Sequence, residues 1–525
     1  MPISPTFPGV YIEEIPSGVR TITGVSTSIA AFIGRAKSGP VNKAITINSY
    51  ADYERIFGGL DLDSAMSFTV RDFFLNGGGQ AIIGRLFNDD GGTPKAKIAT
   101  DTVTFEAAYE GLWGNNLRAR VNDGVSSDVA ASQGLAVADL FNLTIRDTDT
   151  GVTEQYLNVS VKSGPRQIDK VLLDQSKLIR ISGTLVGTEG VPASNPDPQP
   201  GEQAFGDNNP ETNYKVTTAA TPGTVLDAGD YFGAGKSDAK EGLYLLKQAD
   251  LFNLLCLPPE GANADYPAGL FALALAICEE ERALFLVDSP SSWTDKDAAK
   301  NGLDALGDKS KNAALFFPRV RQPNPLRDNQ LEEFVPCGVI AGVMARTDTQ
   351  RGVWKAPAGI EATLRGVPEL SVKLTNDENG ELNPLGINCM RSFPVIGRVI
   401  WGSRTMRGAD ILADDYKYLP VRRLALYLEE SLYRGTQWVV FEPNDEPLWA
   451  QIRLNVGAFM NNLFRQGAFK GTTPKQAYFV KCDKETTTQN DIDRGIVNIV
   501  VGFAPLKPAE FVIIKLQQIA GELEV

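Results

Sequence analysis

The chain has 525 residues, of which 43% are hydrophobic and 22% charged, so it is long enough for several cores and roughly three or four domains. Its net charge of −13 and isoelectric point near 4.8 argue against duplex binding, because contact with phosphates needs a basic surface. The absence of histidine excludes Ser-His-Asp and Cys-His catalysis and any metal site that needs imidazole.

The first twenty or so residues are rich in proline and alternate apolar with polar side chains. Such a segment cannot bury itself, so we expect residues 1–22 to form an extended arm that joins the edge of another sheet. The alternative is a disordered tail, which is common at chain ends. The residues expected in this strand are Val10, Tyr11, Ile12, Glu13 and Ile15.

A small α/β unit is predicted for residues 23–100. Apolar runs at 29–33 and 81–86 indicate buried strands, and the stretches 50–57 and 65–75 between them indicate helices. Glycines follow both helical stretches, as they do where helices end. We expect this unit to pack against a neighbouring α/β domain.

The composition changes over residues 101–242, where threonine, valine, glycine and aspartate dominate. Short alternating strands, such as 142–145 and 156–161, are separated by frequent turn clusters. This pattern predicts an inserted, outward-facing β-sandwich. The GAGKS segment at 233–237 is not a phosphate loop, because Asp230 stands where that motif needs its first glycine.

Strands and helices alternate again over residues 243–392, which predicts a doubly wound α/β domain. Asp288 and Ser289 lie at the end of a predicted strand, where such domains place their ligands. They are either the relic of a catalytic position or polar residues that cap turns or helices. We favour the cap, because no base is available to activate the serine.

An α+β domain is predicted for residues 393–510. Pro420 begins a helix along which leucines recur every four residues, and Gly435 ends it. The apolar run 438–441 indicates a strand buried on both faces, and a second helix follows from Trp449.

A second arm is predicted at 511–525, beyond any compact core. Its expected strand contains Phe511, Val512, Ile513, Ile514, Leu516 and Ile519. A predicted strand at 496–503 has the apolar density of a central strand and is the expected acceptor for the arms. The acceptor residues are Ile496, Val497, Ile499 and Val501.

Charged side chains of this domain fit two interpretations. Arg422 and Arg423 form either a solvated helix face or a contact between subunits. Arg453, Arg465 and Lys470 give the second helix and its end a polar side, which we expect to face a partner with an acidic surface.

Several segments, in order along the chain, resemble contractile tail sheath proteins of phage tails and related injection machines. They are PGVYIEEIPSG at 8–18, FIGRAKSGP at 32–40, GVWKAPAG at 352–359, INCMRSFPVIGRVIWGSRT at 387–405, the run 418–449, and DIDRGIVNIVVGFAPLKPAEFV at 491–512. The resemblance implies an α/β and β multidomain fold, with a subtilisin-like domain lacking the protease site at 243–392. It also implies that residues 393–510 face an inner tube.

The resemblance implies a structural subunit, not an enzyme, that polymerises helically around the tube and contracts to drive it through a target cell envelope. Its implied partners are copies of itself, the tube, and baseplate and tail-terminator proteins, with no cofactor, metal, nucleic acid or membrane insertion. The expected location is the virion tail sheath, or an injection apparatus, assembled in the bacterial cytoplasm. Five cysteines, mostly in apolar contexts, and no basic segment before an apolar N-terminal stretch fit that expectation.

Two alternatives to the sheath function are open. The first is a hydrolase-like enzyme built around Asp288, and the second is another self-assembling surface protein.

Overall fold

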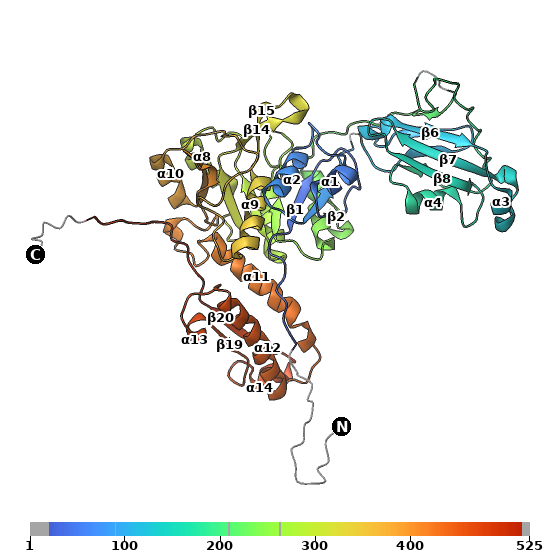
Figure 1. Ribbon diagram of the computed structural model, residues 1–525. Helices are drawn as coiled ribbons and strands as arrows, with labels where there is room; N and C mark the ends of the chain where they lie inside the picture. The colour runs from blue at the N-terminus through green and yellow to red at the C-terminus, as the bar shows by residue number, and fades with distance from the viewer. Residues whose placement is uncertain (1–19, 90, 208–210, 262–263, 517–525) are drawn as a thin grey trace, which may run out of the picture.

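The computed structural model describes residues 20–89, 91–207, 211–261 and 264–516, which form three bodies (Figure 1). A central α/β body contains the largest sheet, a β-rich body lies to one side, and a body built on α11 (Leu419–Gly435) and α12 (Glu446–Arg465) lies below. We call these the central, inserted and C-terminal bodies.

The central body is built on an eight-stranded sheet. Its strands are parallel apart from the two at its edges. The inner strands are buried, except for the last two residues of β17, because helices cover both faces. In spatial order they are β18 (Gly397–Ile400), β17 (Ile387–Phe393), β13 (Ala313–Phe317), β12 (Leu284–Asp288), β11 (Leu254–Cys256), β1 (Ala30–Gly34), β3 (Ala81–Arg85) and β2 (Ala44–Ile47).

Two boundaries expected from the sequence differ from this sheet. β1 hydrogen-bonds directly to β11, so residues 23–100 share one sheet with the later strands and do not form a separate unit. β18 belongs to the same sheet, so the central body extends past residue 393. The pattern of apolar and polar residues within a segment does not show which distant strand it pairs with.

Helices cover the sheet in two layers. One layer contains α1 (Tyr50–Phe57), α2 (Ala65–Asn76) and α9 (Cys337–Arg351). The other contains α7 (Leu270–Glu280), α8 (Lys296–Gly302) and α10 (Asn376–Leu382). Gly338 and Gly342 let α9 approach the backbone of α2, since a Cβ at either position would collide with it. A small sheet of β14 (Val320–Asn324), β15 (Gln330–Phe334) and β16 (Glu369–Leu370) completes the body.

The inserted body contains two sheets around one core. The first sheet is β10 (Tyr214–Lys215), β6 (Leu117–Asn122), β7 (Leu140–Asp147) and β8 (Thr153–Ser160). The second is β4 (Lys97–Ala99), β5 (Thr104–Ala107) and β9 (Ile179–Ile181). Two helices, α3 (Ser127–Gln133) and α4 (Ile168–Gln175), accompany them, and short α5 (Ala228–Phe232) and α6 (Lys236–Ala239) lead back to the central body.

The C-terminal body packs α11 against α12 through Leu424, Leu428 and Ile452. It also contains α13 (Pro474–Ala477), β19 (Tyr478–Lys481), α14 (Gln489–Asp493) and β20 (Val500–Phe503). The strand predicted at 438–441 is wrong: a 3₁₀ turn at Gln437–Val439 occupies the region, and Phe441 is fully exposed. Periodicity cannot separate a four-residue apolar run in a turn from a strand, and no strand in the described part of the chain pairs with this run.

No helix among the residues that the structure describes is both long enough and apolar enough to cross a bilayer. Within the same residues, no group of three or more cysteine, aspartate or glutamate side chains is placed to hold a metal ion.

Candidate functional site

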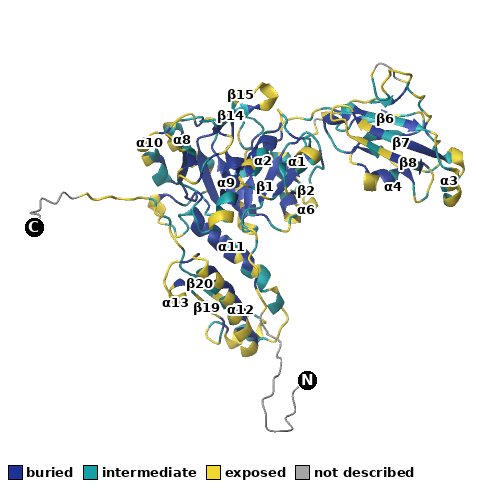
Figure 2. Cartoon of the chain, viewed as in Figure 1, coloured by how far each residue is buried: buried dark blue, intermediate teal, exposed yellow. Residues whose placement is uncertain are grey.

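The C-terminal arm leaves the body of the protein as an extended, exposed segment (Figure 2). Residues 511–516 form no helix or strand, and their apolar side chains are exposed by between 72% at Phe511 and 93% at Leu516. An apolar run of this kind at the surface indicates a contact with another molecule. Ile519 of the predicted arm, and Val10, Tyr11, Ile12, Glu13 and Ile15 of the other arm, lie outside the described residues.

The hairpin of β19 and β20 is the predicted acceptor for the arms. β19 and β20 pair antiparallel from Tyr478 with Phe503 to Lys481 with Val500. No third described strand joins them, so both outer edges are open to pairing.

The prediction of a central strand at 496–503 is wrong for the single chain. Ile496, Val497 and Ile499 precede β20, and only Val501 lies within it. A central strand needs a neighbour on each side, and among the described residues β19 is the one strand that pairs with β20.

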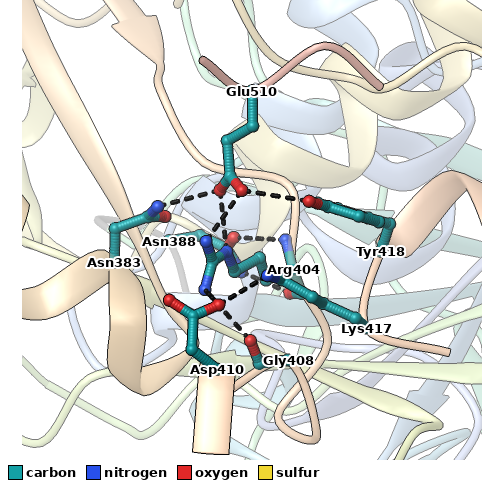
Figure 3. A network of polar contacts seen from close by, with 8 residues as sticks. All are labelled: Asn383, Asn388, Arg404, Gly408, Asp410, Lys417, Tyr418 and Glu510. Carbon is teal, nitrogen blue, oxygen red and sulfur yellow. Dashed lines mark hydrogen bonds and ion pairs between the residues drawn. The ribbon is translucent and has the colours of Figure 1, made fainter. Parts of the chain in front are cut away.

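Glu510 anchors the arm to the central body (Figure 3). Arg404 donates from Nε to Oε1 and from Nη2 to Oε2, both at 2.7 Å. The amide of Asn383 donates to Oε1 at 2.8 Å and the Tyr418 hydroxyl to Oε2 at 3.2 Å. The Glu510 side chain is only 17% exposed, so this two-point ion pair is largely shielded from water.

Arg404 is itself held in place from several sides. Its side chain is fully buried, and Nη1 also donates to the carbonyl of Gly408 and to Asp410, each at 3.1 Å. Its backbone N–H donates to Asn388 at 2.6 Å, which ties the loop to strand β17. A guanidinium fixed in this way presents a preformed site for one carboxylate of the arm.

The pKa of Glu510 reflects these contacts. Burial alone raises it, but the hydrogen bonds from Arg404 and Asn383, together with the positive charge, bring the pKa below its ordinary value. Burial likewise lowers the pKa of Arg404, and the Glu510 carboxylate more than offsets that effect. Glu510 is therefore ionised near neutral pH, and the pair is a true ion pair.

The root of the N-terminal arm follows α11. The backbone N–H of Arg20 donates to Asn455 of α12 at 3.0 Å, and its guanidinium lies 4.5 Å from the Trp438 ring centre. Ile22 is buried, and the N–H of Val25 donates to Ser431 at 3.2 Å.

This N-terminal segment ends at a buried ion pair. Arg423 binds Asp348 through both nitrogens, at 2.8 and 2.6 Å, and donates to the carbonyl of Thr27 at 2.9 Å. The Thr27 hydroxyl donates to the same carboxylate at 2.6 Å. The pair thus joins α11, α9 and the N-terminal segment.

The interpretation of Arg422 and Arg423 as surface charges is wrong. Arg423 makes the buried pair, and Arg422, also buried, donates to Asn312 at 3.0 Å. Both lie where α11 meets the central body. A helix pattern does not reveal that its first turns are enclosed by a neighbouring body.

The segment from the end of α12 to the end of β19 carries positive charge without nearby acidic residues in the sequence. Between residues 454 and 482 the sequence has no aspartate or glutamate. Arg465, Lys470, Lys475 and Lys481 are exposed there and form no ion pair with any described residue. Arg453 differs, because it pairs with Glu446 at 2.6 Å and donates to the carbonyl of Cys482.

Asp288 caps a helix inside the chain, beside a cavity of about 240 Å³. Its Oδ1 accepts from the N–H of Cys337, the first residue of α9, at 2.9 Å. Burial raises its pKa to about 7. This geometry fits the cap that we favoured from the sequence.

Comparisons with known proteins confirm the resemblance to contractile tail sheath proteins. A family model for the phage tail sheath C-terminal domain matches residues 413–519. A tail sheath protein of Vibrio phage KVP40 is 28% identical over 186 residues, covering 35% of this chain and 26% of that protein. One of Enterobacteria phage T4 is 26% identical over 168 residues, covering 32% of this chain and 24% of the relative. The matched region thus spans about a quarter of each relative's length.

Solved sheath structures share the mixed α/β, multi-sheet fold. The helical sheath of the anti-feeding prophage in its contracted state gives a TM-score of 0.56 at 24% identity, covering 98% of this chain and 100% of its own. The sheath complex of an extracellular contractile injection system, also contracted, gives 0.58 at 21% identity, covering 99% of both chains. The sheath tail protein of Listeria innocua gives 0.58 at 13% identity, covering 92% of this chain and 96% of its own.

Proposed function

We propose that this chain is the structural subunit of a contractile sheath, which polymerises helically around an inner tube and contracts to drive that tube through a target cell envelope. The observation that carries the proposal is a pairing of features in one chain. An exposed apolar arm begins at Phe511, and the β19–β20 hairpin offers two open strand edges.

The arms are the joints between copies. A sheath is an open helical array in which one patch of a subunit meets a different patch of its neighbour. Packed side-chain interfaces repack in discrete steps and would separate during a large movement. An arm added as a strand to a neighbour's hairpin is held by backbone hydrogen bonds, and it keeps the array connected while subunits rotate.

Contraction uses energy stored during assembly. The tube and baseplate hold the extended array at a higher free energy than the contracted state. Contraction lowers the free energy because it adds contacts between subunits. No nucleotide or other fuel enters this scheme, and the chain acts as a structural protein and not as an enzyme.

The exposed side chains of Arg465 and Lys470 face the tube, and the tube surface opposite them is acidic. Residues 243–392 correspond to a subtilisin-like domain without its protease site, and residues 101–242 form an outward-facing sandwich. The baseplate and a terminator protein bind the ends of the array. The assembled particle is a phage tail or a related injection device, built in the bacterial cytoplasm.

Deleting residues 1–15 tests the proposal. Without one arm, subunits fold but do not polymerise, so electron microscopy shows no rods while circular dichroism and the melting temperature match those of the full chain. Rods of normal length from the truncated protein would contradict the proposal.

A further inference from the structure

A short strap connects the C-terminal body to the central body just before the arm begins. We define the strap as residues 505–510. At its start, the Ala504 carbonyl accepts from the N–H of Lys470 at 2.9 Å, and Pro505 bridges to Phe469 in the C-terminal body. At its end, Glu510 binds Arg404 in the central body. Between these points, residues 506–509 form no hydrogen bond with any described residue, so Glu510 is the fixed point from which the arm departs.

Without that fixed point, the arm has an acceptor within its own chain. Only residues 504–510 separate β20 from the arm, and the outer edge of β20 is open. This loop is longer than the two to five residues of most hairpin loops, but the entropy of closing a loop grows only slowly with its length. A segment tethered by so short a linker has an effective concentration on the order of millimolar. Pairing within the chain would therefore compete strongly with pairing to a neighbour.

The observed path of the chain prevents this pairing. Figure 1 shows the strap leaving the C-terminal body, reaching the central body near α10, and directing the arm outward, away from β19 and β20. The Phe511 side chain, next to the anchor, is 72% exposed, so the segment is not packed on its own subunit.

We propose that the Glu510–Arg404 pair is a latch that keeps the C-terminal arm off its own hairpin, and so makes the arm available to a second copy of this chain. This inference rests on the proposed strand exchange and names the residues that decide between pairing within a chain and pairing between chains. Glu510 and Arg404 are positioning residues in this scheme.

The latch is tested on freshly purified monomers by chemical crosslinking. Val500→Cys and Ile513→Cys place one thiol on β20 and one on the arm, and a short bis-maleimide joins them when the arm folds back. The five native cysteines are buried, so they should react little with the reagent. Each single-cysteine variant measures the background crosslinking that they cause. Crosslinks within a chain are separated from those between chains by gel mobility.

Glu510→Ala in this background is expected to raise the crosslink within the chain by roughly tenfold, which corresponds to a net loss of ~1.4 kcal/mol when the two-point ion pair with Arg404 is removed. Asp410→Asn is the matched control, since it removes the other carboxylate on Arg404 and leaves Glu510 in place. Asn383→Ala removes one donor to Glu510 without removing a charge, and is expected to give a smaller rise.

Equal crosslink yields in folded wild type and Glu510→Ala would overturn the latch. If Glu510→Ala fails to fold, Asn383→Ala decides by the same measure. The assay needs no polymer, so it separates the two proposals. A wild-type chain that forms no tubes in electron microscopy refutes the sheath function, whereas unchanged crosslinking refutes the latch.

Discussion

The two chain ends are attached to the protein in different ways. The N-terminal segment from Arg20 to Thr27 follows α11 and makes contacts along the way, ending at the buried Arg423–Asp348 pair. The C-terminal strap touches the central body chiefly through Glu510, which remains 17% exposed. The N-terminal segment is attached at several buried points, so it behaves as part of the core. The strap is attached chiefly at one point, so it can move about that point. We infer that the N-terminal segment from Arg20 to Thr27 supports the fold, whereas the attachment at Glu510 sets the direction of the C-terminal arm.

Removing the Asp348 carboxylate is expected to have the largest effect on stability. Asp348→Ala leaves the Arg423 guanidinium buried without its partner, at a cost of about 3–5 kcal/mol in the free energy of unfolding. Urea denaturation measures this cost. A loss below ~1 kcal/mol in the free energy of unfolding would mean that the N-terminal segment from Arg20 to Thr27 contributes no more to stability than the strap does.

Glu510→Ala is expected to cost less, roughly 1–3 kcal/mol, because Arg404 keeps Asp410 and the Gly408 carbonyl. Its main consequence is on assembly, which slows or stops while the monomer remains folded. Light scattering at fixed protein concentration follows assembly. If the variant assembled at the wild-type rate, Glu510 would not determine whether the arm is available for assembly.

Acid should release Glu510 from Arg404. The folded-state pKa of Glu510 is lowered, so its contribution to stability is fully present above its ordinary pKa and is lost as the pH falls through the folded value. Energy transfer between dyes attached at neutral pH to the two cysteines of the latch assay should therefore increase as the pH falls below about 4.5, the ordinary carboxyl value, and Glu510→Ala should abolish this dependence. A parallel rise in the variant would assign the effect to other carboxyl groups.

Arg465→Glu leaves both roots intact and should have the smallest effect on folding. The side chain is exposed and unpaired among the described residues, so unfolding changes by no more than about 0.5 kcal/mol. Co-assembly with the tube protein should weaken, as measured by co-sedimentation. Unaltered co-assembly would remove Arg465 from the proposed tube contact.

The sequence predicted the elements whose signal is local. The helix at 50–57, followed by Gly58, and the buried strand at 81–86 match the structure to within one residue, because capping residues and apolar runs are read from neighbouring positions. The run at 438–441 failed because an apolar tetrapeptide has no period. Arg422, Arg423 and the Arg404–Glu510 pair depend on residues far apart in the chain, and no local pattern carries that information. Arg404 lies inside one of the segments that resemble sheath proteins, but its role follows only from the position of Glu510.

The central claim is that the arm beginning at Phe511 pairs with the hairpin of another copy. The most direct measurement is a cryo-electron microscopy map of tubes assembled from the full chain, traced from Glu510 into the arm. We expect residues 511–516 to form an added strand on the open edge of a neighbour's β19–β20 hairpin, with Glu510 still bound to Arg404. An arm paired with β20 of its own subunit in the assembled tube would contradict it.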